Sequence, residues 1–218
     1  QANDLAGKAR RSILSLRRRI STIPDIQRPA WAVEEDSDPI IAAFLVGGWD
    51  DSNKVDREVL AAIAGKPYKD LRPRLLKLAK TNDPPIRRIG DRWMVVSHED
   101  VWPLMRDVVS AEHLDRFHKA AVELLAAPDP KYDLDPDQQF AAALYGKVPR
   151  GSDDLRAGIC ASLALIGSDG GQVVSRGQIA GDWVRQIVRD VLAAANLDWR
   201  VWASRSSVLG LLAEAAPE

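Results

Sequence analysis

Apolar residues recur every three or four positions over most of the chain, a pattern that predicts a mostly α-helical fold. The first such stripe runs from Ala9 to Ile20, on a helix whose other side is strongly basic. A later stripe follows four-residue spacing and is rich in tryptophan. It predicts the core of a helix pair, formed by Trp183, Ile187, Val191, Trp199 and Trp202.

Helix boundaries in the first half of the chain are marked by capping residues. Asp38-Pro39 predicts the start of a helix, and the apolar run 40–46 predicts that this helix is buried. The glycines at 47 and 48 end it. Ser52 or Asn53 is expected to cap the next helix, which runs to Ala64.

Two helix starts are predicted further along. Ser97 and Asp100 have the spacing of a capping box. Asp135-Pro136 predicts the start of a helix on which Phe140 and Leu144 face inward.

A β-hairpin is predicted where two strand-like segments, 86–89 and 92–96, flank Gly90-Asp91. Over residues 53–96 the order is helix, short helix, helix and hairpin, which is the order of a winged helix. The predicted fold is therefore mostly α: a winged helix-turn-helix with a small two-stranded β-hairpin, followed by a helical array. The expected domains are a lid-like helical segment (1–50), a winged-helix domain (51–108) and a helical domain (109–218) whose helix pairs resemble repeat units.

The composition is that of an ordinary globular protein, with 46% hydrophobic and 28% charged residues in a chain of 218. The longest apolar run is far shorter than the ~20 residues of a membrane span, and no secretory signal opens the chain. A single cysteine excludes an internal disulfide. We therefore expect a cytoplasmic location and no membrane partner. The first residue is not Met and the final helix has no ending signal, which indicates a piece of a longer protein.

The net charge of −1 hides segregated blocks of charge. Residues 8–28 hold seven basic residues against one acid, 34–58 hold eight acids against two bases, and 66–92 hold nine basic residues against three acids. Such blocks indicate charged surfaces that meet partners or one another.

The last basic block falls on the third helix and the hairpin of the predicted winged helix, the parts of that fold that can contact DNA. The candidate contact residues are Arg72, Arg74, Lys77, Arg87, Arg88 and Arg92. Nucleic-acid binding is one interpretation, because such groups neutralise backbone phosphates. Contact with protein is the interpretation we favour. The third helix lacks Asn or Gln to read bases, and the acidic block 34–58 lies close by in the chain.

No pattern in the chain indicates catalysis or metal binding. The only histidines are His98, His113 and His118, and the last two are not spaced as zinc ligands on one helix face, so we expect all three on the surface. Cys160 lies in an apolar run and is expected in the core, not as a nucleophile. We predict that the chain is not an enzyme and holds no cofactor of its own.

The segment Gly7-Lys-Ala-Arg10-Arg11 places arginines at a helix start after a glycine. It resembles the second-sensor helix in the lid of AAA+ and STAND NTPases. The segments Arg28-Pro-Ala-Trp31-Ala and Gly48-Trp49-Asp-Asp-Ser-Asn are similar to large bacterial STAND NTPases of the anti-phage defence kind. The resemblance implies that Arg10 or Arg11 contacts the phosphates of ATP bound elsewhere in the parent protein.

The chain itself lacks the Gly-x-x-x-x-Gly-Lys-Ser/Thr phosphate loop. The resemblance therefore implies a non-catalytic regulatory, signal-relay and oligomerisation module that lies C-terminal to a nucleotide-binding core. Its expected partners are that core or other subunits. The alternative is a winged-helix DNA-binding regulator.

Overall fold

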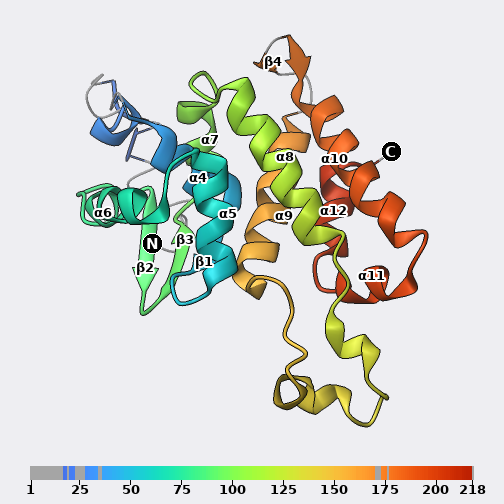
Figure 1. Ribbon diagram of the computed structural model, residues 1–218. Coiled ribbons are helices and arrows are strands. Elements are labelled where there is room, and N and C mark those ends of the chain that lie inside the picture. Colours follow the sequence, from blue (N-terminus) through green and yellow to red (C-terminus); the bar gives the residue numbers. More distant parts are fainter. Residues whose placement is uncertain are drawn as a thin grey trace.

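The computed structural model describes residues 17, 18, 20–22, 28–33, 36–169, 173–175 and 177–217. Figure 1 shows a mostly helical molecule with a small antiparallel sheet on one side, the C-terminal helices on the other and α8 and α9 between them. The predicted mostly α fold is confirmed. Most of the predicted basic helix, including Arg10 and Arg11, lies outside the described residues.

The elements of the first half are η1 (Ala30–Ala32), α4 (Asp38–Val46), β1 (Gly48–Asp50), α5 (Lys54–Ala64), α6 (Tyr68–Leu78), β2 (Ile86–Ile89), β3 (Arg92–Val95) and α7 (His98–Met105). Those of the second half are α8 (Ala111–Leu125), η2 (Pro130–Asp133), η3 (Gln139–Tyr145), α9 (Asp153–Ser168), β4 (Val173–Ser175), β5 (Gln178–Ile179), α10 (Ala180–Ala195), α11 (Trp199–Ser204) and α12 (Leu209–Ala215). One continuous buried cluster joins the two halves, and the predicted domain boundaries stay a prediction.

Helix α4 is buried on all sides, as its apolar sequence predicts. Pro39 occupies the first turn, where a missing N–H costs nothing. Gly47 ends the helix with φ +70°, a conformation that favours glycine. Helices α5, α6, α7, α8 and α9 all pack against α4, so it forms the centre of the first half.

The sheet has three strands in the order β1-β3-β2, all antiparallel. The predicted hairpin β2–β3 is confirmed, whereas β1 was not foreseen because three residues give too little alternation to read. In the register of β1 and β3, Trp49 lies opposite Trp93. Their rings stack with centroids 5.2 Å apart and both are fully buried. This tryptophan pair fixes β1 against the hairpin.

Helix α9 connects the two halves of the molecule. Its backbone at Gly158 touches the chain reversal after α4 so closely that a Cβ there would overlap the Val46 carbonyl and the Gly48 amide. The Ser162 hydroxyl donates to the Phe44 carbonyl at 2.8 Å, fully buried. On its other sides α9 packs against α7, α8, α10 and α12.

A buried carboxylate holds the start of α9 against α5. Asp56 is fully buried and accepts hydrogen bonds from the Asp50 and Ser152 amides, each at 2.8 Å, and from the Ser152 hydroxyl. Ser152 in turn caps α9 through the Leu155 amide. One side chain therefore connects β1, α5 and α9.

The predicted helix caps have mixed outcomes. The Asn53 side chain caps α5 by accepting hydrogen bonds from the Val55 and Asp56 amides, and Gly65 ends the helix, as expected. The capping box predicted at Ser97 is wrong: the Ser97 hydroxyl donates to Glu99 instead of accepting from the helix. The capping box lies at Ser110, whose partner three residues later is a histidine and not the usual glutamate.

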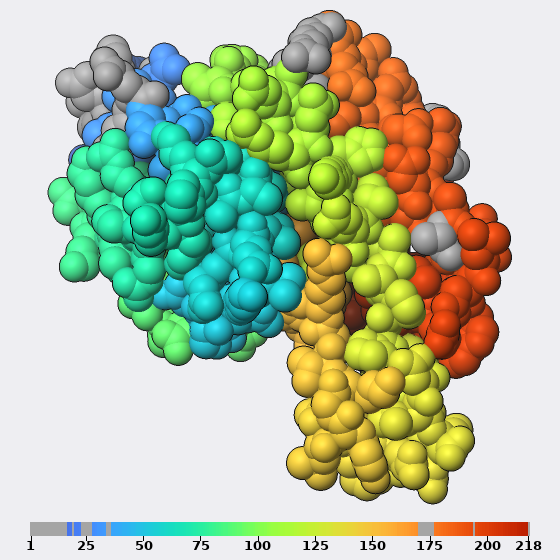
Figure 2. Space-filling model, viewed as in Figure 1, coloured from blue at the N-terminus to red at the C-terminus, as the bar shows by residue number. Residues whose placement is uncertain are grey.

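The segment 128–150, which we call the arm, differs from its prediction. No helix starts at Asp135-Pro136; two short 3-10 turns form, and Ala141 has non-helical backbone angles. Phe140 and Leu144, predicted to face inward, are 91% and 88% exposed. The arm leaves the body between α8 and α9, and Figure 2 shows it as a projecting lobe. Without a neighbouring element, its apolar positions have no core to enter.

The predicted tryptophan core of the last helices is half right. Trp183, Ile187 and Val191 are buried, and the ring of Trp183 lies 5.7 Å from that of Phe117. Trp199 and Trp202 are 65% and 39% exposed, so their predicted burial is wrong. Helix α11 is short and buries Val201 instead. None of the helices in the described ranges is long and apolar enough to cross a bilayer.

Candidate functional site

The six basic residues predicted to contact a partner come from α6 and the hairpin, which lie on the same side of the molecule in Figure 1. We call them the basic set: Arg72, Arg74, Lys77, Arg87, Arg88 and Arg92. Four of them pair with acids that come from other segments of the chain or from the hairpin turn.

Asp51 is the acid that contacts two residues of the basic set, Arg72 and Arg88. Its carboxylate, 7% exposed, accepts from Arg72 Nε at 3.0 Å and from the Tyr68 hydroxyl, and lies 3.8 Å from Arg88 Nη2. Burial raises the pKa of Asp51, but the hydrogen bonds from Tyr68 and Arg72 outweigh it, so the pKa lies below its ordinary value. Asp51 is therefore a stable anion that two of the five arginines of the basic set share.

Two more arginines of the basic set have other partners. Arg74 Nη2 lies 3.8 Å from Asp36, an acid that also binds Lys66 at 2.7 Å. Arg92, at the start of β3, makes a two-pronged ion pair with Asp154 at the start of α9. The acidic block 34–58 thus meets the basic block within the same molecule, and an acid of α9 adds to it.

The hairpin arginines differ from each other. Arg88 binds Asp91 at 3.1 Å, and its guanidinium lies over the Trp93 ring at 5.6 Å from the centroid. Arg87 points to the other face of β2, is exposed, and has no ion pair within the described part of the chain. Lys77 is exposed on α6. A continuous row of unpaired cations is therefore not present among the described residues.

The arm is a second surface, of opposite character. Its exposed apolar side chains are Phe140, Leu144, Tyr145 and Val148, with exposed fractions from 56% to 91%. Large apolar side chains seldom gather in this way on a monomer surface unless they meet a partner. This surface cannot be recognised in the sequence, because a helical spacing of apolar residues is the same whether the face packs on a core or on a partner.

Helix α11 holds the base of the arm. The rings of Tyr132 and Trp199 meet edge to face at 5.5 Å, and Arg200 binds Asp133 at 2.7 Å. Lys147, from the returning end of the arm, binds the same carboxylate at 3.0 Å. The pKa of Asp133 is lowered, chiefly by the Lys147 hydrogen bond. The arm is thus tied to the body at its base while its apolar tip stays exposed.

The three histidines and the cysteine are buried or half-buried. His113 is buried at the start of α8, which corrects its predicted surface position; its Nε2 lies 3.2 Å from Asp38 Oδ1. His118 is half-buried and contacts Asp190 at 2.7 Å. Cys160 is buried, and burial raises the pKa of its thiol to about 12. Within the described ranges, His, Cys, Asp and Glu do not gather into a group that could hold a metal.

Comparison with known proteins gives no match, whether to a protein family, to a curated protein or to a solved structure.

Proposed function

We propose that the chain is a non-catalytic protein-interaction and signal-relay module that associates with further copies of itself through the arm. The observation that carries the proposal is the exposure of Phe140 and Leu144 on a segment that projects from the body (Figure 2). Burying one such side chain in an interface contributes roughly 1.5–3 kcal/mol. The four apolar residues of the arm therefore suffice for a contact of moderate strength.

Residues 38–95 have the order helix, strand, helix, helix, strand, strand, and the first strand pairs with the hairpin. This arrangement supports a winged helix, with α6 in the place of the DNA-contacting helix and β2–β3 as the wing. Its three helices are α4, α5 and α6, because the segment predicted as a short helix and a third helix holds the single helix α6, and α4 precedes the predicted bounds 53–96. The pairing of Arg72 and Arg88 with Asp51, and of Arg92 with Asp154, leaves fewer cations free for backbone phosphates and so weighs against DNA binding by this unit. DNA binding stays the alternative, and the exposed Arg87 is the observation in its favour.

Relay requires that the winged-helix-like unit and the arm move as one body. The Asp56–Ser152 network and the contact of α9 with α4 provide that connection. We further propose that the parent protein is a STAND-like NTPase whose nucleotide core acts on this unit. Arg10 and Arg11, outside the described residues, keep their predicted contact with its ATP.

The test is sedimentation velocity of the purified chain over a range of concentrations. We expect the wild type to associate at micromolar concentration and the double variant Phe140→Ser with Leu144→Ser to stay monomeric. Ile89→Ser is the matched control, because Ile89 is also an exposed apolar residue, at 59%, but lies on the hairpin. A wild type that stays monomeric throughout overturns the proposal, as does a control variant that dissociates equally.

A DNA titration at two salt concentrations tests the alternative. We expect little duplex affinity at ~150 mM salt, where exposed charges are screened beyond about 8 Å. If the chain binds duplex DNA tightly, and the logarithm of the association constant falls with the logarithm of the salt concentration at a slope near −4 to −5, about five phosphates are contacted. That result would replace our proposal with the DNA-binding one.

A further inference from the structure

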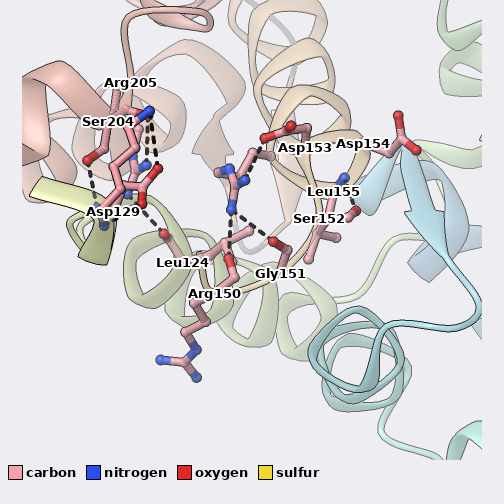
Figure 3. A network of polar contacts seen from close by, with 12 residues as sticks. Leu124, Asp129, Arg150, Gly151, Ser152, Asp153, Asp154, Leu155, Ser204 and Arg205 are labelled. Atoms are coloured by element: carbon pink, nitrogen blue, oxygen red, sulfur yellow. Dashed lines mark hydrogen bonds and ion pairs between the residues drawn. The ribbon is translucent and has the colours of Figure 1, made fainter. Parts of the chain in front are cut away.

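A pocket of about 450 Å³ lies at the root of the arm. Both ends of the arm line it (128–131 and 149–150), together with the first turn of α9 and the segment 203–208 that joins α11 to α12. Figure 3 shows Arg205, Ser204 and Asp129 on one side of this region and the start of α9 with Asp153 on the other. The volume is within the range of pockets that hold small organic ligands.

Arg205, in the wall of this pocket, is a buried cation without a carboxylate partner. It is 4% exposed and donates to the carbonyls of Leu124, Leu125, Ala127 and Ser204, at the end of α8 and beside it. Within the described part of the chain it has no ion pair. These carbonyls hold the guanidinium in place but carry only partial charge. The Asp129 carboxylate acts on Arg205 as well, but its ion pair is with Lys131, so much of the positive charge of Arg205 stays uncompensated.

Arg156, also in the pocket wall, adds a second guanidinium. Its side chain is 12% exposed and donates to the Arg150 and Gly151 carbonyls and to Asp153. Asp153 is 97% exposed, so its carboxylate is well hydrated and offsets little of the charge within the pocket. Burial and, second, repulsion by Arg156 lower the pKa of Arg205 to about 10. Both side chains line the same pocket, so the two cations share it.

Both guanidinium groups have donors to spare. A guanidinium has five N–H groups. Arg205 uses four in its four hydrogen bonds, and Arg156 uses three, so one N–H group of Arg205 and two of Arg156 have no partner among the described residues. At the rim, the exposed hydroxyls of Ser206 and Ser207 make no hydrogen bond to any described residue.

The remaining charges of the pocket are internally balanced. Lys131 pairs with Asp129 at 3.5 Å, and Arg150 turns away to Glu123 at 3.4 Å. The excess positive charge is therefore that of Arg156 and Arg205.

We propose that the root pocket binds a small molecule that carries phosphate groups, with an oxyanion held between Arg156 and Arg205 and a further one at Ser206 and Ser207. Guanidinium groups bind phosphate oxygens through paired hydrogen bonds, and an anion between two like charges removes their repulsion. This proposal is independent of the proposed self-association through the arm, since ligand binding to the pocket can be measured whether or not the chain associates.

Titration calorimetry with inorganic tripolyphosphate tests the site. At ~50 mM salt we expect saturable binding to the wild type with one site per chain, and weaker binding of sulfate, which spans only one of the two anion positions. Absence of saturable tripolyphosphate binding overturns the proposal, and equal affinity for sulfate overturns the assignment to a phosphate-bearing ligand.

A charge placed at the rim locates the binding. Ser206→Asp puts a carboxylate into the pocket without removing a hydrogen bond, and we expect it to weaken tripolyphosphate binding about tenfold by repulsion. Asn82→Asp is the matched control, with the same charge change at an exposed residue between α6 and β2 that is not part of the pocket and whose side chain makes no hydrogen bond to any described residue. Binding that is unchanged in Ser206→Asp, or equally weakened in both variants, overturns the proposal.

Discussion

The basic set and the arm differ in opposite ways from what their sequences predict. The basic set looks like a binding surface in the sequence, but Asp51, Asp36 and Asp154 pair with most of it. The arm looks like part of the core in the sequence, but Phe140 and Leu144 are exposed. Charges find partners over several ångströms from any nearby segment, whereas an apolar side chain is buried only where another element covers it.

The largest loss of stability is expected from a substitution that breaks the connection between the two surfaces. Asp56→Ala leaves the Ser152 amide, the Ser152 hydroxyl and the Asp50 amide without their acceptor. We expect the free energy of unfolding to fall by about 3–5 kcal/mol, because buried groups lose charge-assisted hydrogen bonds. Urea unfolding measures the loss.

Asp137→Ala is the control for Asp56→Ala, since Asp137 is an exposed acid on the arm, and its effect should stay within about 0.5 kcal/mol. A similar small loss in both variants would mean that α9 does not depend on Asp56.

An intermediate effect is expected from Asp51→Asn, which sharpens the comparison by releasing two arginines. The amide keeps a hydrogen bond but loses the ion pairs with Arg72 and Arg88. We expect a loss of about 1–3 kcal/mol at pH 7 by thermal unfolding. Duplex DNA affinity at low salt should rise, with a log–log salt slope steeper by about 2. An unchanged slope would show that Asp51 does not mask the basic set.

The pH dependence of the same variant gives a second measurement. The pKa of Asp51 lies below its unfolded value near 3.9, so its contribution to stability is present above that pH and is lost as the pH falls through the folded pKa. The stability difference between wild type and Asp51→Asn should therefore shrink below about pH 4. A difference that is constant from pH 7 to pH 3 would contradict the assigned charge.

The smallest effect is expected on the arm. Phe140→Ala should change the free energy of unfolding of the monomer by less than about 0.5 kcal/mol, because the side chain is already in water. Phe117→Ala, which removes a fully buried ring that packs on Trp183, should cost about 3–5 kcal/mol. Chemical denaturation at low concentration compares the two, and equal losses would place Phe140 in a core.

Local sequence signals predicted the elements whose partners are close in the chain. Asn53 and Gly65 bound α5, and Gly90-Asp91 forms the hairpin turn, because caps and turns are decided by a few neighbouring residues. The burial of α4 followed from its unbroken apolar run.

Long-range partners were not predictable in the same way. The pairing of Arg92 with Asp154, the close approach of Gly158 to Gly47 and the exposure of Trp199 all depend on where α9 and α11 dock. The residues of the basic set could be named from the sequence. For the arm, the sequence showed only that apolar residues recur at helical spacing, and not that they are exposed. The root pocket was invisible, since its walls come from three distant segments.

The docking of α9 on α4 also sets an order of events during synthesis. The Phe44 carbonyl accepts its hydrogen bond from Ser162, which is synthesised 118 residues later. At the ~5–20 residues per second of translation, roughly 6–24 s pass before the side of α4 that faces α9 can be covered. During that interval one side of α4, which is apolar all round, has no helix against it on the nascent polypeptide. Until α9 has emerged, this uncovered side is an apolar surface of the kind that makes partly synthesised chains prone to aggregate.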